Sequence, residues 1–427
     1  MTSAPRVSVI GLGYVGLPLA VALARRFEVI GFDASPVRIG ELRCGFDRTR
    51  EVEPEALKAS RVELAAEPAA IGRATLHIIT VPTPVDAANR PDLSAVLAAC
   101  ATVGAQLKRG DVVVLESTVW PGVTEEICGP ALGRASGLAP GRDFFLGYSP
   151  ERVNPGDRVH RLEKIAKVIA GQTPEVVELL RTVYGAITDG GVFVARNIMT
   201  AEAAKAIENA QRDINIAFVN EIAMIFQKLG LSTRDVLDAA ATKWNFVRFE
   251  PGLVGGHCIG VDPYYLAHRA ETLGHHPEII LAGRRINDRM AIFVADCIAD
   301  RLAAQAKTRR APVLVLGLTF KENVPDLRNS QVPSLVRRLM TRGHAVEVHD
   351  PLADADEAQR HYGLRLLPSL EGKRGYGCVV GAVAHEAYRA FAEEGIEGLL
   401  KPGGLVADIR GMWRGLELSA DYGRWEL

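Results

Sequence analysis

A glycine-rich turn near the start of the chain limits the possible folds more than any other feature. The apolar, β-branched run 6–10 leads into Gly11-Leu12-Gly13-Tyr14-Val15-Gly16, and an Ala/Leu-rich helical stretch, 17–26, follows. A second apolar run, 27–32, ends on Asp33. Such glycines allow a tight turn close to a pyrophosphate, and a carboxylate at the end of the second strand can accept bonds from a ribose 2′-hydroxyl. The pattern predicts a dinucleotide site, with a purely structural turn as the alternative, and because Asp33 would repel a 2′-phosphate it favours NAD over NADP.

The same alternation of strands and helices continues along the first half of the chain. Residues 76–81 and 112–115 are short apolar runs that read as strands, separated by the helical stretch 93–107. This order predicts a parallel, doubly wound sheet. Residues 200–229 then form one stretch without Pro or Gly, which predicts a long helix with Thr200 as its N-cap and Gly230 as its stop.

A second α/β region follows a Gly-rich loop at 251–260, further helix over about 263–304 and a charged linker at 307–310. It repeats the opening order, with a strand at 311–317, a helix at 333–342 and a strand at 345–350 that ends in Asp-Pro. We therefore expect an α/β protein with two Rossmann-like, doubly wound parallel-sheet domains joined by a long central helix and a helical segment. The expected domains are 1–198, 199–305 and 306–427.

Composition excludes several classes of protein. The chain has 427 residues, 48% of them hydrophobic, and its 50 Lys and Arg balance 51 Asp and Glu, so nucleic acid and anionic membranes are poor expected partners. The N-terminus lacks the pattern of a signal peptide, and no uncharged apolar segment is long enough to cross a bilayer. The six Cys lie far apart without a C-x-x-C pair, and no His spacing suits a ligand set, so we expect reduced thiols, a cytoplasmic location and no metal.

Two groups of polar residues are candidates for chemistry. Cys258 lies between glycines with Asp262 four residues later, and from the residues alone a nucleophile and a buried thiol are equally good interpretations, while the adjacent His257 is more easily structural. Lys205 and Asn209 are four residues apart on the long helix and could stabilise an oxyanion, although the residues alone favour a solvated charge beside a polar neighbour.

Several polar loops directly follow predicted strands, where ligands bind in open α/β sheets. They are the loops 81–84, 116–122 and 149–152. A further loop, Phe320–Ser330, follows the first strand of the third region, and its Lys321 and Arg328 could bind phosphate oxygens. Ordinary surface loops are the alternative interpretation of all four.

Taken together, these motifs resemble the UDP-sugar 6-dehydrogenase family over essentially the whole chain. The resemblance rests on blocks that occur in the family's order: 11–16, 81–84, 116–122, 149–152, 203–209 and 255–263, together with the loop 320–330. It implies an NAD-binding N-terminal domain, a helical middle that dimerises and a C-terminal domain that helps to bind UDP. It also implies oxidation of the sugar C6 alcohol to a carboxylate with two NAD and no release of the aldehyde.

The resemblance implies a role for each matching residue. Cys258 would be the nucleophile that forms a thiohemiacetal and then a thioester, Lys205 and Asn209 would stabilise oxyanions, and Asp262, Glu151 and Thr118 would position and activate water, with Glu151 as the general base. Cofactor-binding positions are Gly11, Leu12, Gly13, Tyr14, Val15, Gly16, Asp33, Arg38, Thr83, Thr118 and Arg328. Substrate-binding positions are Glu151, Arg152, Lys205, Asn209, Arg248, Phe249, Gly252, Gly255, Lys321 and Arg410.

The loop around Cys258 indicates the branch of the family. Gly260-Val261 stands where the UDP-glucose branch typically has Pro-Lys, and together with the loop 245–252 it resembles the branch that acts on UDP-N-acetylglucosamine or UDP-N-acetylgalactosamine. We expect such a sugar nucleotide as substrate, a uronic acid for a surface polysaccharide as product, and a homodimer or larger homo-oligomer. UDP-glucose and UDP-N-acetylmannosamine remain alternative substrates, and a nucleotide-sugar-binding regulator remains the non-enzymatic alternative.

Overall fold

The structure is a computed structural model, and it describes residues 4–86, 88–153, 162–256, 259–306 and 310–427. The chain divides into two compact units. The first comprises residues 1–208 and 264–276, and the second comprises residues 209–263 and 277–427. The division falls within the long helix α7 (Ile198–Leu229). The expected three-domain boundaries stay a prediction.

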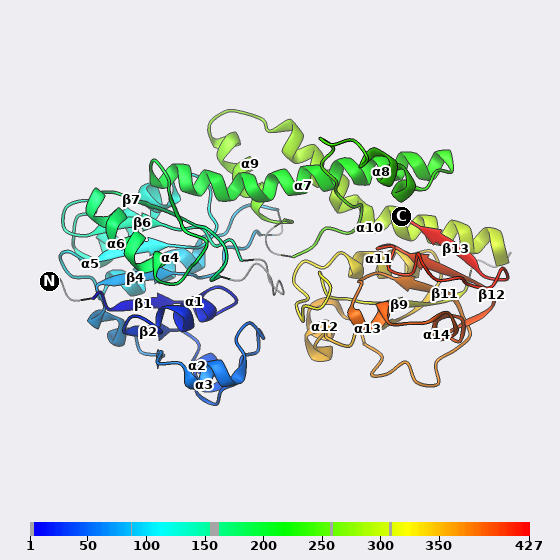
Figure 1. The fold of residues 1–427 in the computed structure, drawn as a ribbon, viewed down its shortest axis with the longest axis horizontal. Helices are drawn as coiled ribbons and strands as arrows, with labels where there is room; N and C mark the ends of the chain where they lie inside the picture. Colours follow the sequence, from blue (N-terminus) through cyan, green and yellow to red (C-terminus); the bar gives the residue numbers. More distant parts are fainter. Residues whose placement is uncertain (1–3, 87, 154–161, 257–258, 307–309) are drawn as a thin grey trace. The chain divides into compact units, whose positions relative to one another are not determined.

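The first unit is built on a sheet with the strand order β3-β2-β1-β4-β5-β6-β7-β8, coloured from blue to green in Figure 1. The order of its first six strands is that of a dinucleotide-binding sheet. Its strands are β1 (Val7–Ile10), β2 (Val29–Phe32), β3 (Glu63–Ala65), β4 (Leu76–Ile79), β5 (Val112–Leu115), β6 (Phe145–Tyr148), β7 (Lys167–Gly171) and β8 (Val192–Val194). Its helices are α1 (Gly16–Leu23), α2 (Pro36–Arg43), α3 (Pro54–Ala59), η1 (Pro68–Arg73), α4 (Ser94–Gly104), η2 (Thr124–Cys128), α5 (Gly129–Ser136), α6 (Pro174–Gly185) and most of α9 (Asp262–Thr272).

The predicted doubly wound sheet is confirmed, and it contains one strand pairing that the sequence did not predict. Strands β1, β2, β4 and β5 are buried along their whole length, which explains their uninterrupted apolar runs. Strand β6 pairs with β7 in the antiparallel sense, with Tyr148 opposite Ala170. Strand β7, which follows the loop that contains Glu151, therefore runs in the direction opposite to β6.

The second unit contains a five-stranded sheet of parallel pairs in the order β10-β9-β11-β12-β13. Its strands are β9 (Pro312–Leu316), β10 (Ala345–His349), β11 (Tyr376–Gly381), β12 (Leu400–Asp408) and β13 (Gly423–Glu426). Its helices are α8 (Thr233–Ala240), α10 (Glu278–Ala306), α11 (Val332–Thr341), α12 (Ala355–Tyr362), α13 (Glu386–Arg389) and α14 (Glu393–Glu397), together with α7 from Asn209 onward.

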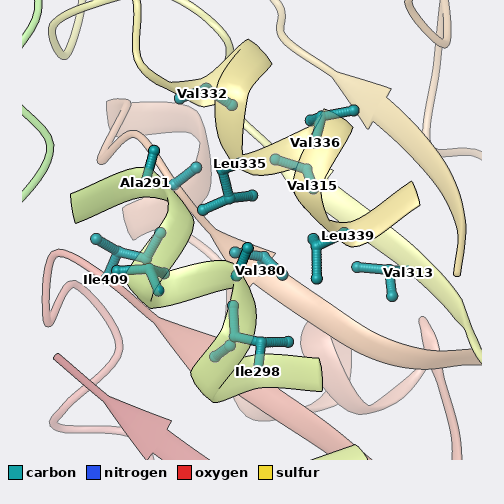
Figure 2. Packing of buried hydrophobic residues seen from close by; sticks show 14 of the residues in the cluster. Ala291, Ile298, Val313, Val315, Val332, Leu335, Val336, Leu339, Val380 and Ile409 are labelled. Carbon is teal, nitrogen blue, oxygen red and sulfur yellow. The ribbon is translucent and has the colours of Figure 1, made fainter. Parts of the chain in front are cut away.

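This unit has a buried core on each face of the sheet, and the larger one lies between the sheet and the helices α10 and α11. Figure 2 shows Ile298 of α10 and Leu335 and Leu339 of α11 close to Val313 of β9 and Val380 of β11. All five side chains are completely buried. Burial of a side chain of this size contributes about 1.5–3 kcal/mol, so the two helices are held on the sheet by apolar contact rather than by charge.

Two helix boundaries differ from those expected. Helix α7 begins at Ile198 rather than at Thr200, because Asn197 Oδ1 accepts hydrogen bonds from the backbone N–H and the hydroxyl of Thr200. Asn197 is therefore the cap, and Thr200 as N-cap was wrong. The helical stretch at 263–304 is two helices, α9 and α10, separated at Gly274 (φ +80°) and Pro277.

Candidate active site

The glycine-rich turn of the first unit has room for a phosphate group on one side only. Gly11 has φ +93°, and a Cβ on Gly16 would lie 1.9 Å from the Gly11 carbonyl oxygen and 2.3 Å from Thr80 Oγ1. A Cβ on Gly13 would meet no heavy atom within 4 Å. The turn is therefore closed at Gly16 and open at Gly13, which is the arrangement that lets a pyrophosphate approach the backbone.

The carboxylate expected to bind the ribose lies beside this turn. Asp33 Oδ2 accepts a hydrogen bond of 2.9 Å from Leu12 N, and Oδ1 accepts one of 2.9 Å from Ser35 N. Each oxygen keeps acceptor capacity, and the side chain is only half-buried. These residues fit an NAD site. The Arg38 guanidinium donates a hydrogen bond to Leu12 O and forms an ion pair of 2.7 Å with Asp47. Its contacts therefore support the turn.

The loops after β4 and β5 lie together, as their position after neighbouring strands predicts. Ser117 Oγ donates to Val81 O at 2.6 Å. Tyr265 of α9 donates to Thr83 O at 2.7 Å, and its ring is 5.9 Å from that of Trp120. Thr83 is buried and Thr118 is half-buried on these loops. Tyr265 could not be recognised in advance, because a tyrosine in a helix is usually a core residue.

A buried carboxylate fixes the far end of the loop 116–122. Glu202 of α7 accepts hydrogen bonds from Gly122 N at 2.6 Å and from Thr124 N and Oγ1 at 2.9 and 2.6 Å. Burial raises the pKa of Glu202, and the hydrogen bonds from Thr124 and Gly122 oppose that rise. Lys205, one helical turn further on, is also buried, and the part of the chain that the structure describes gives it no ion pair.

In the loop after β6, Glu151 and Arg152 make different contacts. Glu151 accepts a hydrogen bond from Val153 N. Arg152 forms an ion pair of 3.0 Å with Glu208 and donates to Ala166 O at 3.0 Å. The guanidinium of Arg152 is thus already held by protein groups, whereas the carboxylate of Glu151 is available for a further contact.

In the second unit, two predicted catalytic residues are in direct contact. Asn209 Nδ2 donates to Asp262 Oδ2 at 2.5 Å, and both side chains are buried. Asp262 is the first residue of α9, where the partial positive charge of a helix N-terminus favours a carboxylate. The predicted nucleophile Cys258 and its neighbour His257 lie outside the described residues.

Predicted substrate-binding positions of the second unit also gather. A Cβ on Gly252 would lie 2.7 Å from Arg410 Nη1, and a Cβ on Gly255 would lie 2.8 Å from Asn329 O and 3.0 Å from Phe320 Cβ. Gly255 therefore packs so closely against the loop 320–330 that a side chain would require the backbone to move, whereas at Gly252 the flexible Arg410 side chain would have to shift.

A buried amide that the sequence analysis missed anchors this loop. Asn220 of α7 donates to Gly252 O at 3.0 Å and accepts from Gly252 N at 2.8 Å, and it also donates to Asn287 Oδ1 at 2.8 Å. Two asparagines in helices of mixed polarity give no signal of this kind in a single sequence.

Two predicted ligand-binding arginines are held by carboxylates of the same unit. Arg248 forms ion pairs of 2.6 Å with both Asp238 and Glu250, and Arg328 forms one of 2.7 Å with Asp326. Phe249 and Lys321 are half-buried. Among the described residues, no three His, Cys, Asp or Glu side chains are grouped to hold a metal ion. No described helix is both long and apolar enough to cross a bilayer.

Comparison with known proteins places the chain in one family along its length. Residues 5–188 match the NAD-binding domain of the UDP-glucose/GDP-mannose dehydrogenase family, residues 199–289 its central domain and residues 314–415 its UDP-binding domain. The chain is 50% identical over 422 residues to protein CapL of Staphylococcus aureus, covering 99% of both chains. It is 48% identical to a UDP-N-acetyl-D-glucosamine 6-dehydrogenase of Pseudomonas aeruginosa, covering 95% of this chain and 96% of the other.

A solved structure supports the fold. The UDP-D-ManNAc dehydrogenase of Pyrococcus horikoshii has a TM-score of 0.87 at 29% identity and covers 98% of both chains. The open turn at Gly13, the available carboxylate of Asp33 and the three matched domains lead to one conclusion. The chain belongs to the UDP-glucose/GDP-mannose dehydrogenase family and is an NAD-dependent UDP-sugar dehydrogenase.

Proposed function

We propose that the protein oxidises C6 of a UDP-N-acetylhexosamine, with UDP-N-acetylglucosamine as the preferred substrate, to the uronic acid. One observation carries the choice of sugar. Relatives named UDP-N-acetyl-D-glucosamine 6-dehydrogenase are 48% and 46% identical, whereas a UDP-N-acetyl-D-mannosamine dehydrogenase is 34% identical and an NDP-N-acetyl-D-galactosaminuronic acid dehydrogenase 32%. The Gly260-Val261 pair agrees with this choice.

The proposed mechanism needs a nucleophile because an aldehyde carbon must bind a heteroatom before it can lose a second hydride. We assign that role to Cys258, whose sulfur would hold C6 first as a thiohemiacetal and then as a thioester. NAD, when bound against the turn 11–16 and Asp33, supplies the hydride acceptor for both oxidations. Covalent attachment to Cys258 keeps the aldehyde from escaping.

Lys205 and Asn209 are assigned to the stabilisation of the negative oxygen on C6. A buried ammonium such as that of Lys205 is expensive to keep without a counter-charge, and an oxyanion of the substrate would supply one. Asn209 donates one amide proton to Asp262 at 2.5 Å, which leaves the other for the substrate.

Hydrolysis of the thioester is the last step. Glu151 would take a proton from a water molecule held by Thr118 and Asp262 as the new C–O bond forms and the C–S bond breaks, and the sulfur leaves as a thiolate. The carboxylate product and the free Cys258 complete the cycle. We place this reaction in the cytoplasm, where the uronic acid would serve as a precursor of a surface polysaccharide.

The test is a panel of four sugar nucleotides with NADH counted per sugar consumed. UDP-N-acetylglucosamine should give the highest kcat/KM and two NADH per molecule. Cys258→Ala should abolish turnover, while Cys44→Ala, which removes an exposed thiol, should not change it. Preference for UDP-glucose or UDP-N-acetylmannosamine would overturn the choice of sugar. Turnover without Cys258 would overturn the mechanism, and binding of both ligands without NADH would indicate a regulator.

We also propose a homodimer formed through the central helices. Phe218 and Ile225 are seven residues apart on α7, hence on one face, and they are 57% and 45% exposed. Phe218→Glu should convert the dimer to a monomer in light scattering. Phe193→Glu, at an equally exposed phenylalanine of β8, should leave the mass unchanged. A monomeric unsubstituted protein would contradict the proposal.

A further inference from the structure

Two buried charged residues of the first unit have no part in the chemistry assigned so far. Glu116 and Lys167 have completely buried side chains, and Lys167 Nζ lies 3.4 Å from Glu116 Oε1. The same ammonium lies 4.0 Å from Glu151 Oε2, whose side chain is 12% exposed. One cation is therefore shared between a fully buried carboxylate and the carboxylate proposed as the general base.

The sheet register explains why these three residues meet. Leu115 at the end of β5 pairs with Tyr148 at the end of β6. Glu116 and Ser149, the residues that follow these strands, therefore lie side by side. Across the antiparallel junction Tyr148 lies opposite Ala170, and continuing that register by three residues brings Glu151 opposite Lys167. The antiparallel strand β7 thus places the Lys167 ammonium beside the loop that contains Glu151.

Complete burial makes this charged pair costly. Glu116 Oε2, Ser149 Oγ and the Tyr184 hydroxyl are buried together, and the Tyr184 hydroxyl faces both the glutamate and the serine. Lys167 Nζ lies 5.0 Å from the centre of the Tyr184 ring. Apolar residues of the same size would stabilise a core at least as well as a buried ion pair. A charged pair retained beside a proposed catalytic carboxylate therefore points to a role in the reaction.

We infer that Glu116 and Lys167 are positioning residues for Glu151, with the Lys167 ammonium orienting its carboxylate and Glu116 competing for the same ammonium. The inference rests on the role proposed for Glu151. When Glu116 carries a proton, the ammonium has Glu151 as its only ionised partner in the trio. When Glu116 ionises, the ammonium is shared between the two carboxylates, and its hold on Glu151 weakens.

The charges around the trio are few. Burial raises the pKa of Glu116 to about 7, the Lys167 ammonium opposes that rise and the Glu151 charge adds to it. Tyr184 of α6 faces the trio with a pKa raised by burial, so it stays neutral. Arg152, the nearest residue along the loop, is paired with Glu208 at 3.0 Å. Glu116 therefore has a pKa near neutral pH.

The experiment is the pH profile of kcat in variants that change charge in opposite senses. Glu116→Gln keeps this position neutral at every pH, so the change in kcat that accompanies ionisation of Glu116 near pH 7 should disappear. Lys167→Met removes the cation beside the Glu151 carboxylate, so the acid limb of the profile should move to higher pH by about one unit. Lys167→Arg, which keeps the charge, should move it less than Lys167→Met. The KM values for NAD and the sugar nucleotide should stay within about threefold, because neither residue is proposed to touch them.

A change in kcat near pH 7 that persists in Glu116→Gln, or an acid limb that stays in place in Lys167→Met, would overturn the inference. If Lys167→Met does not fold, Glu116→Gln decides by itself, since it keeps the volume and hydrogen-bonding shape of the side chain. Failure of the proposed function is distinguishable. It would show as no NADH from any sugar nucleotide, or as thioester hydrolysis that continues in Glu151→Gln, whereas failure of this inference alone would show as an active enzyme whose pH profile is the same in every variant.

Discussion

Each unit of the protein contains a strand that leads into a tight glycine turn, and the two units use this turn differently. In the first, the N–H of Gly11 donates to Phe32 O at 2.8 Å, and in the second the N–H of Gly317 donates to His349 O at 2.9 Å. Both glycines have positive φ, +93° and +97°. A strand, a tight turn, a helix and a second strand therefore follow in the same order at residues 7–33 and 312–350, although the helix begins at Gly16 in the first and, after a longer loop, at Val332 in the second.

The carboxylate at the end of the second strand is also shared. Leu12 N donates to Asp33 at 2.9 Å, and Leu318 N donates to Asp350 at 2.6 Å. Asp33 accepts one further backbone bond and is half-buried. Asp350 is buried and accepts three further backbone bonds, from Thr319, Leu352 and Ala353.

A histidine side chain also contacts the carboxylate of the second unit. His385 Nε2 lies 3.1 Å from Asp350 Oδ2 and 3.1 Å from the hydroxyl of Thr319, which is itself completely buried. Thr319 occupies the position that Gly13 has in the first unit, two residues after the first glycine. Side chains thus fill the second turn and saturate its carboxylate. The comparison teaches that the supersecondary structure does not make a dinucleotide site, and that unused acceptors and open space do.

The largest expected effect is on the carboxylate that serves structure. Asp350→Ala should destabilise the second unit by about 4 kcal/mol, because four backbone N–H groups and His385 lose their acceptor. Urea unfolding followed by circular dichroism measures this. Asp354→Ala, at the exposed N-cap of α12, is the matched control and should cost about 1 kcal/mol. Equal effects of the two substitutions would contradict the distinction drawn between the units.

The next largest expected effect is on the pH dependence of stability, which should differ between the two units. Hydrogen bonds and the charge of His385 lower the pKa of Asp350 to about 2 against the opposing effect of burial, so its stabilisation is present above pH 3.8 and is lost as the pH falls through about 2. Glu116 is the opposite case, because its pKa is raised to about 7 from 4.5. Its contribution is present below pH 4.5 and is lost as the pH rises to about 7.

The Glu116→Gln variant isolates that contribution. Thermal unfolding gives the free energy of unfolding of each protein, and the difference between the unsubstituted protein and the variant should change by about 3 kcal/mol between pH 4.5 and pH 7. Glu178→Gln, at an exposed glutamate of α6, should show no such change. A constant difference across this window would mean that Glu116 does not hold a proton in the folded protein.

Asp33 should show the reverse of Asp350, with a smaller effect. Asp33→Asn should raise the KM for NAD about tenfold, because a neutral amide accepts a ribose hydroxyl proton more weakly, and the KM for NADP should fall as repulsion of the 2′-phosphate is removed. The free energy of unfolding should change by less than about 1 kcal/mol, since only two backbone bonds are involved. Initial rates with each cofactor measure this, and an unchanged KM for NAD would contradict the assignment.

The sequence predicted the parts of the fold that local pattern controls. The strand at 112–115 has the predicted bounds, and the glycine-rich turn and its aspartate are placed as expected. Asn197 was missed as the cap of α7 because Thr200 is an equally good capping residue three positions later. The break between α9 and α10 has its signal in Gly274 and Pro277, which the periodicity on both sides concealed.

The parts that could not be predicted depend on contacts distant in sequence. Lys167 is a charged residue at the start of an apolar strand, and only the antiparallel register of β7 shows that it faces Glu116. Tyr265 and Thr83 are 182 residues apart in the chain. A single sequence carries no trace of such pairs. The assigned catalytic roles, by contrast, came from the family resemblance, and they stay predictions until the variants are measured.

The smallest expected effect tests whether open space is what separates the two turns. Gly13→Ala adds a methyl group where no heavy atom lies within 4 Å, so the protein should fold normally, yet the KM for NAD should rise about threefold as the methyl group meets the pyrophosphate. Gly40→Ala, at an equally open glycine of α2, should leave the KM unchanged and add up to about 1 kcal/mol of stability. If Gly13→Ala bound NAD as well as the unsubstituted protein, a side chain at the position of Thr319 would not be enough to exclude a dinucleotide from the second turn, and the saturation of Asp350 would have to exclude it alone.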